Sequence, residues 1–225
     1  MKNMIELKNI NKTFTSGKNN VVNALKDINL NIKEGSVVVL KGASGSGKSS
    51  ILSLVSAISK PTSGEVIVDN KRISKLSDKF ASEYRLENIG IVFQKYNLIE
   101  DISVEQNVIL PLIPKNTDTN VVEKKVEQVL DMFEIKHYKD TDVKNLSGGE
   151  QQRVAIARAY INDPKIIIAD EPTANLDEKL SLDFIRIVKD LKSKNKTIII
   201  ATHDPLFFKL DFVDSYIELK DGRII

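Results

Sequence analysis

The sequence predicts an α/β fold whose core is a largely parallel sheet. Segments of four or five uncharged, mostly apolar residues have the length and composition of fully buried strands, namely residues 36–40, 166–169 and 197–201. Residues 4–10 and 28–32 instead alternate apolar and polar side chains, as half-buried antiparallel strands do. Residues 95–145 carry apolar side chains at helical spacing. We therefore expect a mixed parallel sheet with an antiparallel β subdomain and an inserted α-helical subdomain.

Length and composition indicate one globular domain over residues 1–225. Of the 225 residues, 41% are hydrophobic and 28% are charged, as in ordinary folded domains. A net charge of +2 is too small for a basic nucleic-acid-binding surface, so we expect no nucleic-acid partner. The absence of cysteine excludes disulfides and thiolate metal sites. No apolar run has the length of a signal peptide or a membrane span, so a membrane role requires a partner protein.

Between the two antiparallel strands, Phe14 lies in a short polar stretch. A ring on an exposed segment ahead of a ligand-binding loop can stack on a planar base. Taken alone, however, an aromatic residue is better explained by packing in a core.

The next element is a glycine-rich loop at residues 42–49, which matches the phosphate-binding pattern G-x-x-x-x-G-K-[ST] at every specified position. Glycine lets consecutive N–H groups face one point, and the following helix directs its positive dipole end there. We expect this P-loop to hold a nucleotide, with Lys48 on the phosphates and the Ser49 hydroxyl on Mg²⁺. The alternative is a loop without ligand. The predicted nucleotide-binding residues of this segment are Gly42, Ala43, Ser44, Gly45, Ser46, Gly47, Lys48, Ser49 and Ser50.

After the P-loop and its helix, residues 60–65 predict a turn and residues 66–69 and 89–93 predict strands, the second of which ends at Gln94. The helical insert follows at residues 95–145. Its apolar positions at helical spacing are Val121, Val122, Val126, Val129, Leu130 and Phe133. We therefore expect residues 1–94 and 146–225 to form the core and its antiparallel part.

Residues 145–153 predict the start of a second helix, which contains two adjacent glycines. Ser147 is placed as its N-cap, and Glu150, three residues later, completes a capping box. Capping does not explain Gly148 and Gly149, because glycine weakens a helix start. Two glycines there suit a helix N-terminus that brings bare backbone to a phosphate.

Acidic residues follow the apolar strand at residues 166–169. Asp170 and Glu171 stand at its carboxyl end, which is where open α/β sheets bind ligands. Asp170 can hold Mg²⁺, and Glu171 can orient and deprotonate an attacking water. His203 follows the next apolar strand, where it can contact a γ-phosphate or that water. His137 lies in a charged stretch and is read as an ordinary surface histidine.

Taken in order, the P-loop, Gln94, residues 146–150, residues 170–171, residues 174–177 and His203 resemble the ATPase subunit of an ABC transporter. The resemblance covers nearly the whole chain, and the Leu-Ser-Gly-Gly-Glu-Gln-Gln-Arg stretch is specific to this family. It implies the P-loop NTPase fold, ATP and Mg²⁺ as cofactors, and a homodimer in the ATP-bound state. Each ATP would then be held by the P-loop of one subunit and capped by Ser147, Gly148 and Gly149 of the other.

The same resemblance implies roles for single residues. Phe14 would stack on the base, and Gln94 would link Mg²⁺ and water to the helical insert. Glu171 would be the general base, His203 would contact the γ-phosphate, and Asp177 would lie at the dimer interface. Phe14 replaces the more usual tyrosine and Ala174 the glycine of close relatives, and neither departure should harm the chemistry. The implied metal ligands are Ser49, Gln94 and Asp170, and the implied catalytic residues are Lys48, Gln94, Glu171 and His203.

Within the family, residues 93–112 and 172–177 are similar to the MacB, LolD and FtsE group. This similarity implies an integral membrane permease of the FtsX or MacB kind as partner, and a peripheral location on the cytoplasmic face of the membrane. The function would be export, antimicrobial-peptide or macrolide efflux, or mechanical work of the lipoprotein-release type. The alternatives are a regulatory ATPase of the cell-division type and a soluble ABC ATPase that acts on nucleic acid or ribosomes.

Overall fold

The computed structural model describes residues 2–16, 20–115, 117–174 and 176–225. Its central sheet has six strands in the order β10-β9-β3-β8-β7-β6, parallel except for β10, which pairs antiparallel with β9. The strands are β3 (Val37–Lys41), β6 (Ile89–Val92), β7 (Ile166–Asp170), β8 (Thr197–Thr202), β9 (Ser215–Lys220) and β10 (Arg223–Ile224). The apolar segments predicted as buried strands form β3, β7 and β8 at its centre.

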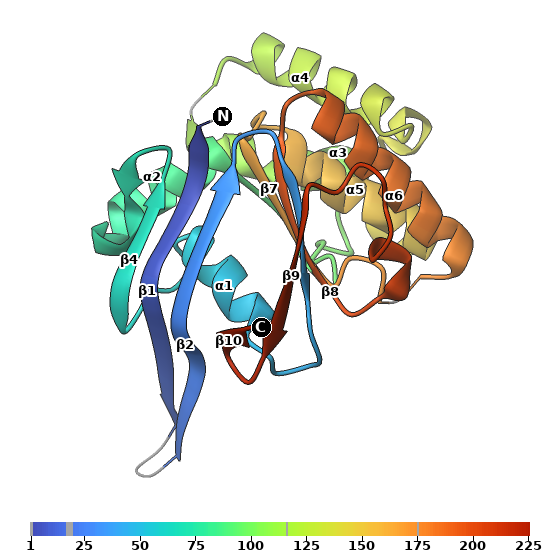
Figure 1. Cartoon of the computed structure of the whole chain (residues 1–225). Helices are drawn as coiled ribbons and strands as arrows, with labels where there is room; N and C mark the ends of the chain where they lie inside the picture. Colours follow the sequence, from blue (N-terminus) through green and yellow to red (C-terminus); the bar gives the residue numbers. More distant parts are fainter. Residues whose placement is uncertain (1, 17–19, 116, 175) are drawn as a thin grey trace.

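A second sheet is antiparallel, in the order β2-β1-β4-β5. Its strands are β1 (Asn3–Ser16), β2 (Asn20–Lys33), β4 (Ser63–Val68) and β5 (Lys71–Arg72). The first two are longer than predicted, and Phe14 belongs to the β1 ladder opposite Val22 rather than to a separate stretch. Both of these side chains are exposed, so this pair in the hairpin of β1 and β2 (Figure 1) gave no apolar alternation from which the longer strands could be predicted.

Helices cover the central sheet. They are α1 (Lys48–Val55), α2 (Asp78–Asn88), α3 (Val104–Ile109), α4 (Thr119–Met132), α5 (Gly148–Tyr160) and α6 (Glu178–Ser193). Short 3₁₀ turns lie at Ile73–Lys75, Leu110–Lys115, Lys136–Tyr138, Val143–Asn145 and Pro205–Phe207. The insert predicted at residues 95–145 contains α3 and α4, with Val126, Val129 and Leu130 buried and Val121 exposed. The described residues contain no helix long and apolar enough to cross a bilayer.

Alternating side chains of the central strands contribute to two cores. Val37 and Val39 of β3 pack with α3 to α6, whereas Val38 and Leu40 pack with α1 and the antiparallel sheet. Figure 1 shows α1 between the two sheets. Each fully buried aliphatic side chain contributes roughly 1.5–3 kcal/mol to the free energy of folding. Packing on both faces therefore holds the central strands in place, and with them the residues that follow each strand. The division into core and helical subdomains at residues 94/95 and 145/146 stays a prediction.

Strand register brings the predicted polar residues to one edge of the sheet. Lys41 at the end of β3 pairs with Thr202 of β8, and Asp170 at the end of β7 pairs with Ala201. The residues that follow these strands therefore emerge side by side at the carboxyl edge, where ligands bind in sheets of this kind.

Candidate active site

The P-loop connects β3 to α1 through residues 42–47. Gly42, Gly45 and Gly47 have φ of 149°, 79° and 109°. A Cβ on Gly47 would lie 2.8 Å from the Ala24 carbonyl oxygen, whereas a Cβ on Gly45 would meet nothing within 4 Å. Gly47 is also the N-cap of α1, and no side chain accepts a hydrogen bond there. The first N–H groups of α1 are therefore left for a ligand.

A cleft of about 560 Å³ opens above the P-loop. Predicted residues that line it are Ser44, Gly45, Ser46, Gly47, Lys48, Ser49, Ser50, Gln94, Asp170, Glu171 and His203. Residues that sequence reasoning missed are Val22, Asn23, Ala24 and Lys26 from β2, and Asp221 and Gly222 from the β9–β10 turn. These come from strands distant in sequence and carry no motif, so only the packing of the two sheets brings them to the cleft.

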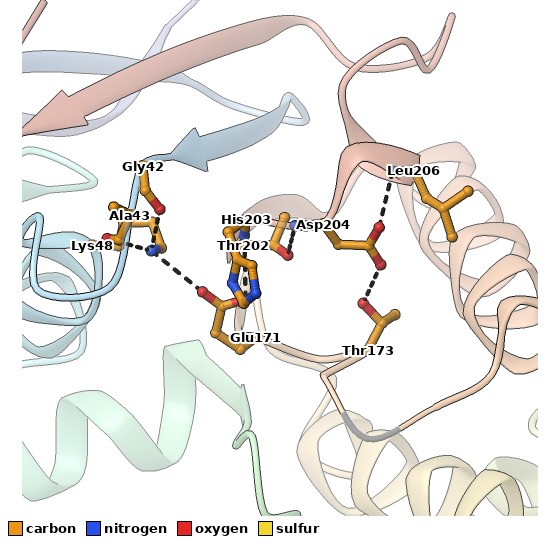
Figure 2. A network of polar contacts seen from close by, with 9 residues as sticks. All are labelled: Gly42, Ala43, Lys48, Glu171, Thr173, Thr202, His203, Asp204 and Leu206. Atoms are coloured by element: carbon orange, nitrogen blue, oxygen red, sulfur yellow. Dashed lines mark hydrogen bonds and ion pairs between the residues drawn. The ribbon is translucent and has the colours of Figure 1, made fainter.

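Lys48 is almost fully buried at the base of the cleft. Its Nζ donates to the carbonyl oxygens of Gly42 and Ala43 at 2.7 and 3.2 Å. It also lies 3.3 Å from Glu171 Oε1, as Figure 2 shows. Three oxygen partners hold the ammonium group at the mouth of the P-loop.

Glu171 follows β7 with a positive φ of 45°. Its Oε2 lies 2.9 Å from His203 Nδ1 and accepts a hydrogen bond from the His203 backbone N–H at 3.3 Å. Burial raises the pKa of Glu171, but the hydrogen bonds from His203 and the charge of Lys48 outweigh it, so the pKa lies below its ordinary value. The carboxylate is therefore ionised at neutral pH.

Asp170 is the more deeply placed carboxylate. Burial raises its pKa, and a hydrogen bond from Ser49 opposes the shift. Its buried Oδ1 has no hydrogen-bond partner in the described part of the chain. A buried carboxylate oxygen without a partner, next to a hydroxyl and an amide at the same cleft, is the kind of donor set that Mg²⁺ prefers.

The helix start at Ser147 lies outside this cleft. Ser147 Oγ and Glu150 Oε2 are 2.7 Å apart, and the capping box is complete. Gly149 is buried against Leu180, and a Cβ on Gly149 would lie 2.5 Å from Leu180 Cδ2, so the Leu180 side chain would have to move to admit a larger residue. Gly148 is exposed, and a Cβ on it would meet only Leu176, at 3.9 Å. The two exposed residues of this start, Ser147 and Gly148, face solvent rather than the chain's own P-loop.

The remaining predicted residues occupy separate places. The Phe14 ring is 45% exposed and does not line the cleft, although Val22 opposite it does. Asp177 caps α6 by accepting a hydrogen bond from the Leu180 N–H at 2.9 Å, which gives it a structural role. Asn175, part of the motif at residues 174–177, lies outside the described residues.

Comparison with known proteins identifies relatives of the whole chain. Residues 25–174 match the family described as ABC transporter. MJ0796 of Methanocaldococcus jannaschii, an uncharacterized ABC transporter ATP-binding protein, is 41% identical over 98% of this chain and 95% of its own length. A solved dimer of MJ0796 in a post-hydrolysis state with ADP and Pi has a TM-score of 0.89, over 98% of this chain and 96% of that one. This similarity confirms the predicted fold class.

Two further relatives have names that state a transported substrate and a direction. The macrolide export ATP-binding/permease protein MacB of Haemophilus ducreyi is 38% identical over 99% of this chain, which spans 32% of MacB. The methionine import ATP-binding protein MetN of Aliivibrio fischeri is 42% identical over 89% of this chain and 58% of MetN. The chain therefore belongs to the ABC transporter family, as an ATP-binding subunit with ATPase activity.

Proposed function

We propose that two copies of this chain close on ATP, hydrolyse it at Glu171, and drive a partner permease in the membrane. The observation that carries the proposal is the position of the Glu171 carboxylate between the Lys48 ammonium and the His203 imidazole. These groups meet at the cleft that opens on the P-loop. A base, a phosphate-binding cation and a polar contact for the γ-phosphate are the groups that hydrolysis requires.

In the proposed reaction, Lys48 exchanges its contact with Glu171 for the β- and γ-phosphates, because several phosphate charges attract the ammonium more strongly than one carboxylate. Glu171 is then free to accept the proton of the attacking water, whose oxygen bonds to the γ-phosphorus as ADP leaves. His203 stays near the γ-phosphate. Asp170, Ser49 and Gln94 would hold Mg²⁺, which when bound neutralises phosphate charge.

We propose that a second copy completes each site. Ser147 and Gly148 are exposed at a helix N-terminus that does not face the P-loop of its own chain. They can reach ATP only from another molecule, together with the backbone of Gly149. Phe14 would stack on the base from the exposed hairpin, and Asp177 would lie at the interface. The dimeric MJ0796 structure with ADP and Pi supports this arrangement.

The proposed partner is an integral membrane permease of the FtsX or MacB kind, which would hold this chain at the cytoplasmic face. Support comes from the extent of the match to MacB, whose name combines ATP-binding and permease parts. The match covers 99% of this chain but only about a third of MacB, so a separate permease would supply the part that this chain does not match. The work would be export, efflux or lipoprotein-type mechanotransmission. The match to the importer MetN covers less of this chain.

The test is Glu171→Gln, which removes the base and keeps the side-chain volume. We expect ATP binding and ATP-dependent dimers to persist while turnover falls by a factor of about 100 or more. Lys48→Ala is the control, because it should lose ATP binding instead. Turnover by Glu171→Gln at the level of the unmodified chain would remove Glu171 from the role of base.

The permease is tested by co-purification from native membranes, with the Glu171→Gln protein held on ATP. Recovery of a polytopic membrane protein would support the transporter proposal and suggest its substrate class. Recovery of ribosomes or DNA instead would contradict it.

A further inference from the structure

Two loops at the carboxyl edge of the central sheet are joined by side-chain contacts at two points. At the first, His203 contacts Glu171 through both its Nδ1 and its backbone N–H. At the second, the Thr173 hydroxyl donates to Asp204 Oδ2 at 2.8 Å. Figure 2 shows both contacts, which connect the segment after β7 to the segment after β8. The proposed reaction uses only the first.

Asp204 is held in a single orientation. Its second carboxylate oxygen accepts a hydrogen bond from the Leu206 N–H at 3.0 Å and caps the 3₁₀ turn at Pro205–Phe207. Its own backbone N–H donates to Thr202 Oγ1 at 3.0 Å. Because Asp204 follows His203 directly, a fixed Asp204 limits where the His203 backbone N–H can point.

Thr173, which donates this hydrogen bond to Asp204, is buried, with 4% of its surface exposed. Its neighbour Pro172 is fixed as well, since the Pro172 carbonyl oxygen accepts a hydrogen bond from Gln152 Nε2 of α5 at 2.8 Å. The His203 side chain is 67% exposed, so packing does little to hold the imidazole against Glu171. Its orientation therefore depends on the Nδ1 contact with Glu171 and on the backbone on either side.

We propose that Thr173 and Asp204 are positioning residues for ATP hydrolysis. Their hydrogen bond holds the segment after β8 against the segment after β7, and so keeps His203 on the Glu171 carboxylate. The inference rests on the proposed roles of Glu171 and His203. Neither Thr173 nor Asp204 lines the cleft, so both act through these neighbours.

The test is Thr173→Val, which removes the hydroxyl with little change in volume. Displacing a reacting group slightly can lower a rate by about 100-fold, so we expect kcat of the full chain to fall by about 10- to 100-fold with KM for ATP unchanged. Thr173→Ser keeps the hydroxyl and should restore kcat. Thr197→Val is the matched control, because Thr197 is also buried and also uses its hydroxyl in a hydrogen bond, with the Gly35 N–H, but at the opposite end of β8.

A double variant tests whether Thr173 acts through His203. Thr173→Val should lower kcat by a much smaller factor in a His203→Ala background, because the imidazole is already absent and only the backbone N–H of residue 203 remains to be positioned. Additive losses would overturn the proposal, as would unchanged kcat in Thr173→Val or equal losses in Thr173→Val and Thr197→Val. Should Thr173→Val not fold, Asp204→Asn is the second variant, because it weakens the same contact while keeping an oxygen for the Leu206 N–H. For this variant too, kcat should fall while KM for ATP stays unchanged. Turnover by Glu171→Gln in the same assay would instead contradict the proposed function itself.

Discussion

The helices α1 and α5 both have glycine at their starts, and both are proposed to face ATP phosphates, but they are capped in opposite ways. At α1 the N-cap is Gly47, which offers no side-chain oxygen, and no acidic residue stands in the first turn. At α5 the N-cap is Ser147, and Glu150 completes the capping box. The first helix leaves its N–H groups free, whereas the second satisfies part of them within the chain.

The two helix starts also carry opposite charges. Lys48 begins α1 and directs a cation into the cleft. Glu150 lies in the first turn of α5, where a hydrogen bond from Tyr138, followed by those from Ser147, holds its pKa below its ordinary value. A negative charge at a helix N-terminus competes with any incoming anion. In the proposed dimer, α1 would therefore bind ATP first, and α5 would contact only the ATP that another chain holds.

Adding one methyl group to each helix start tests the difference between α1 and α5 with the largest expected effect. Gly47→Ala places a Cβ 2.8 Å from the Ala24 carbonyl oxygen and from Leu25 Cδ2, at a φ of 109°. The free loop would relax away from this conformation, and restoring it on binding would cost about 1–3 kcal/mol, which lowers ATP affinity by about 10- to 100-fold. Calorimetric titration of the full chain with ATP measures it.

Gly148→Ala is the matched variant at α5. Its Cβ would meet only Leu176 at 3.9 Å, so ATP affinity of the single chain should not change. Equal losses of affinity in the two variants would contradict the distinction between the helix starts.

The sequence was sufficient to predict the features that this comparison uses. The P-loop pattern and the Ser147–Glu150 spacing depend on residues close in the chain, and the apolar runs of β3 and β7 reflect burial on both faces. Helix α2 was not predicted, because only Ala81 and Tyr84 are buried on it and no apolar stripe results.

Contacts between distant segments left no signal in the sequence. The Thr173–Asp204 hydrogen bond joins residues that are 31 positions apart and come together only because β7 and β8 are neighbours. Asn23 and Lys26 line the cleft because β2 packs over α1, which no local pattern encodes. Sequence motifs were therefore enough to predict the polar residues that follow the central strands. The cleft residues from β2 and the contact between Thr173 and Asp204 depend on how the strands and sheets pack, so no motif predicted them.

Ser147→Ala tests whether α5 contacts ATP only between chains. Its expected effect on the single chain is smaller than that of Gly47→Ala and concerns stability, not ATP affinity. Loss of the cap lowers the free energy of unfolding by about 1 kcal/mol, or about 2–4 °C in Tm. ATP affinity of the single chain should stay unchanged while ATP-dependent dimers and turnover are lost. Light scattering in the Glu171→Gln background measures the dimer, and Ser147→Thr, which keeps a capping hydroxyl, is the control. A loss of single-chain ATP affinity would mean that α5 contacts the nucleotide of its own chain.

The smallest expected effect concerns the charge that α5 already carries. Because the folded pKa of Glu150 lies below its ordinary value of 4.5, its contribution to stability is present above pH 4.5 and is lost as the pH falls through the folded pKa. Tyr138→Phe removes the main cause of that shift, so Tm at pH 7 should fall by about 1 °C and the difference should shrink toward pH 3. Tyr84→Phe is the control, since Tyr84 donates to the Val55 carbonyl oxygen, which does not titrate in this range. A Tyr138→Phe difference that stays constant with pH would show that the Glu150 carboxylate is not the group that Tyr138 stabilises, and would contradict this hydrogen bond as the main cause of the lowered pKa.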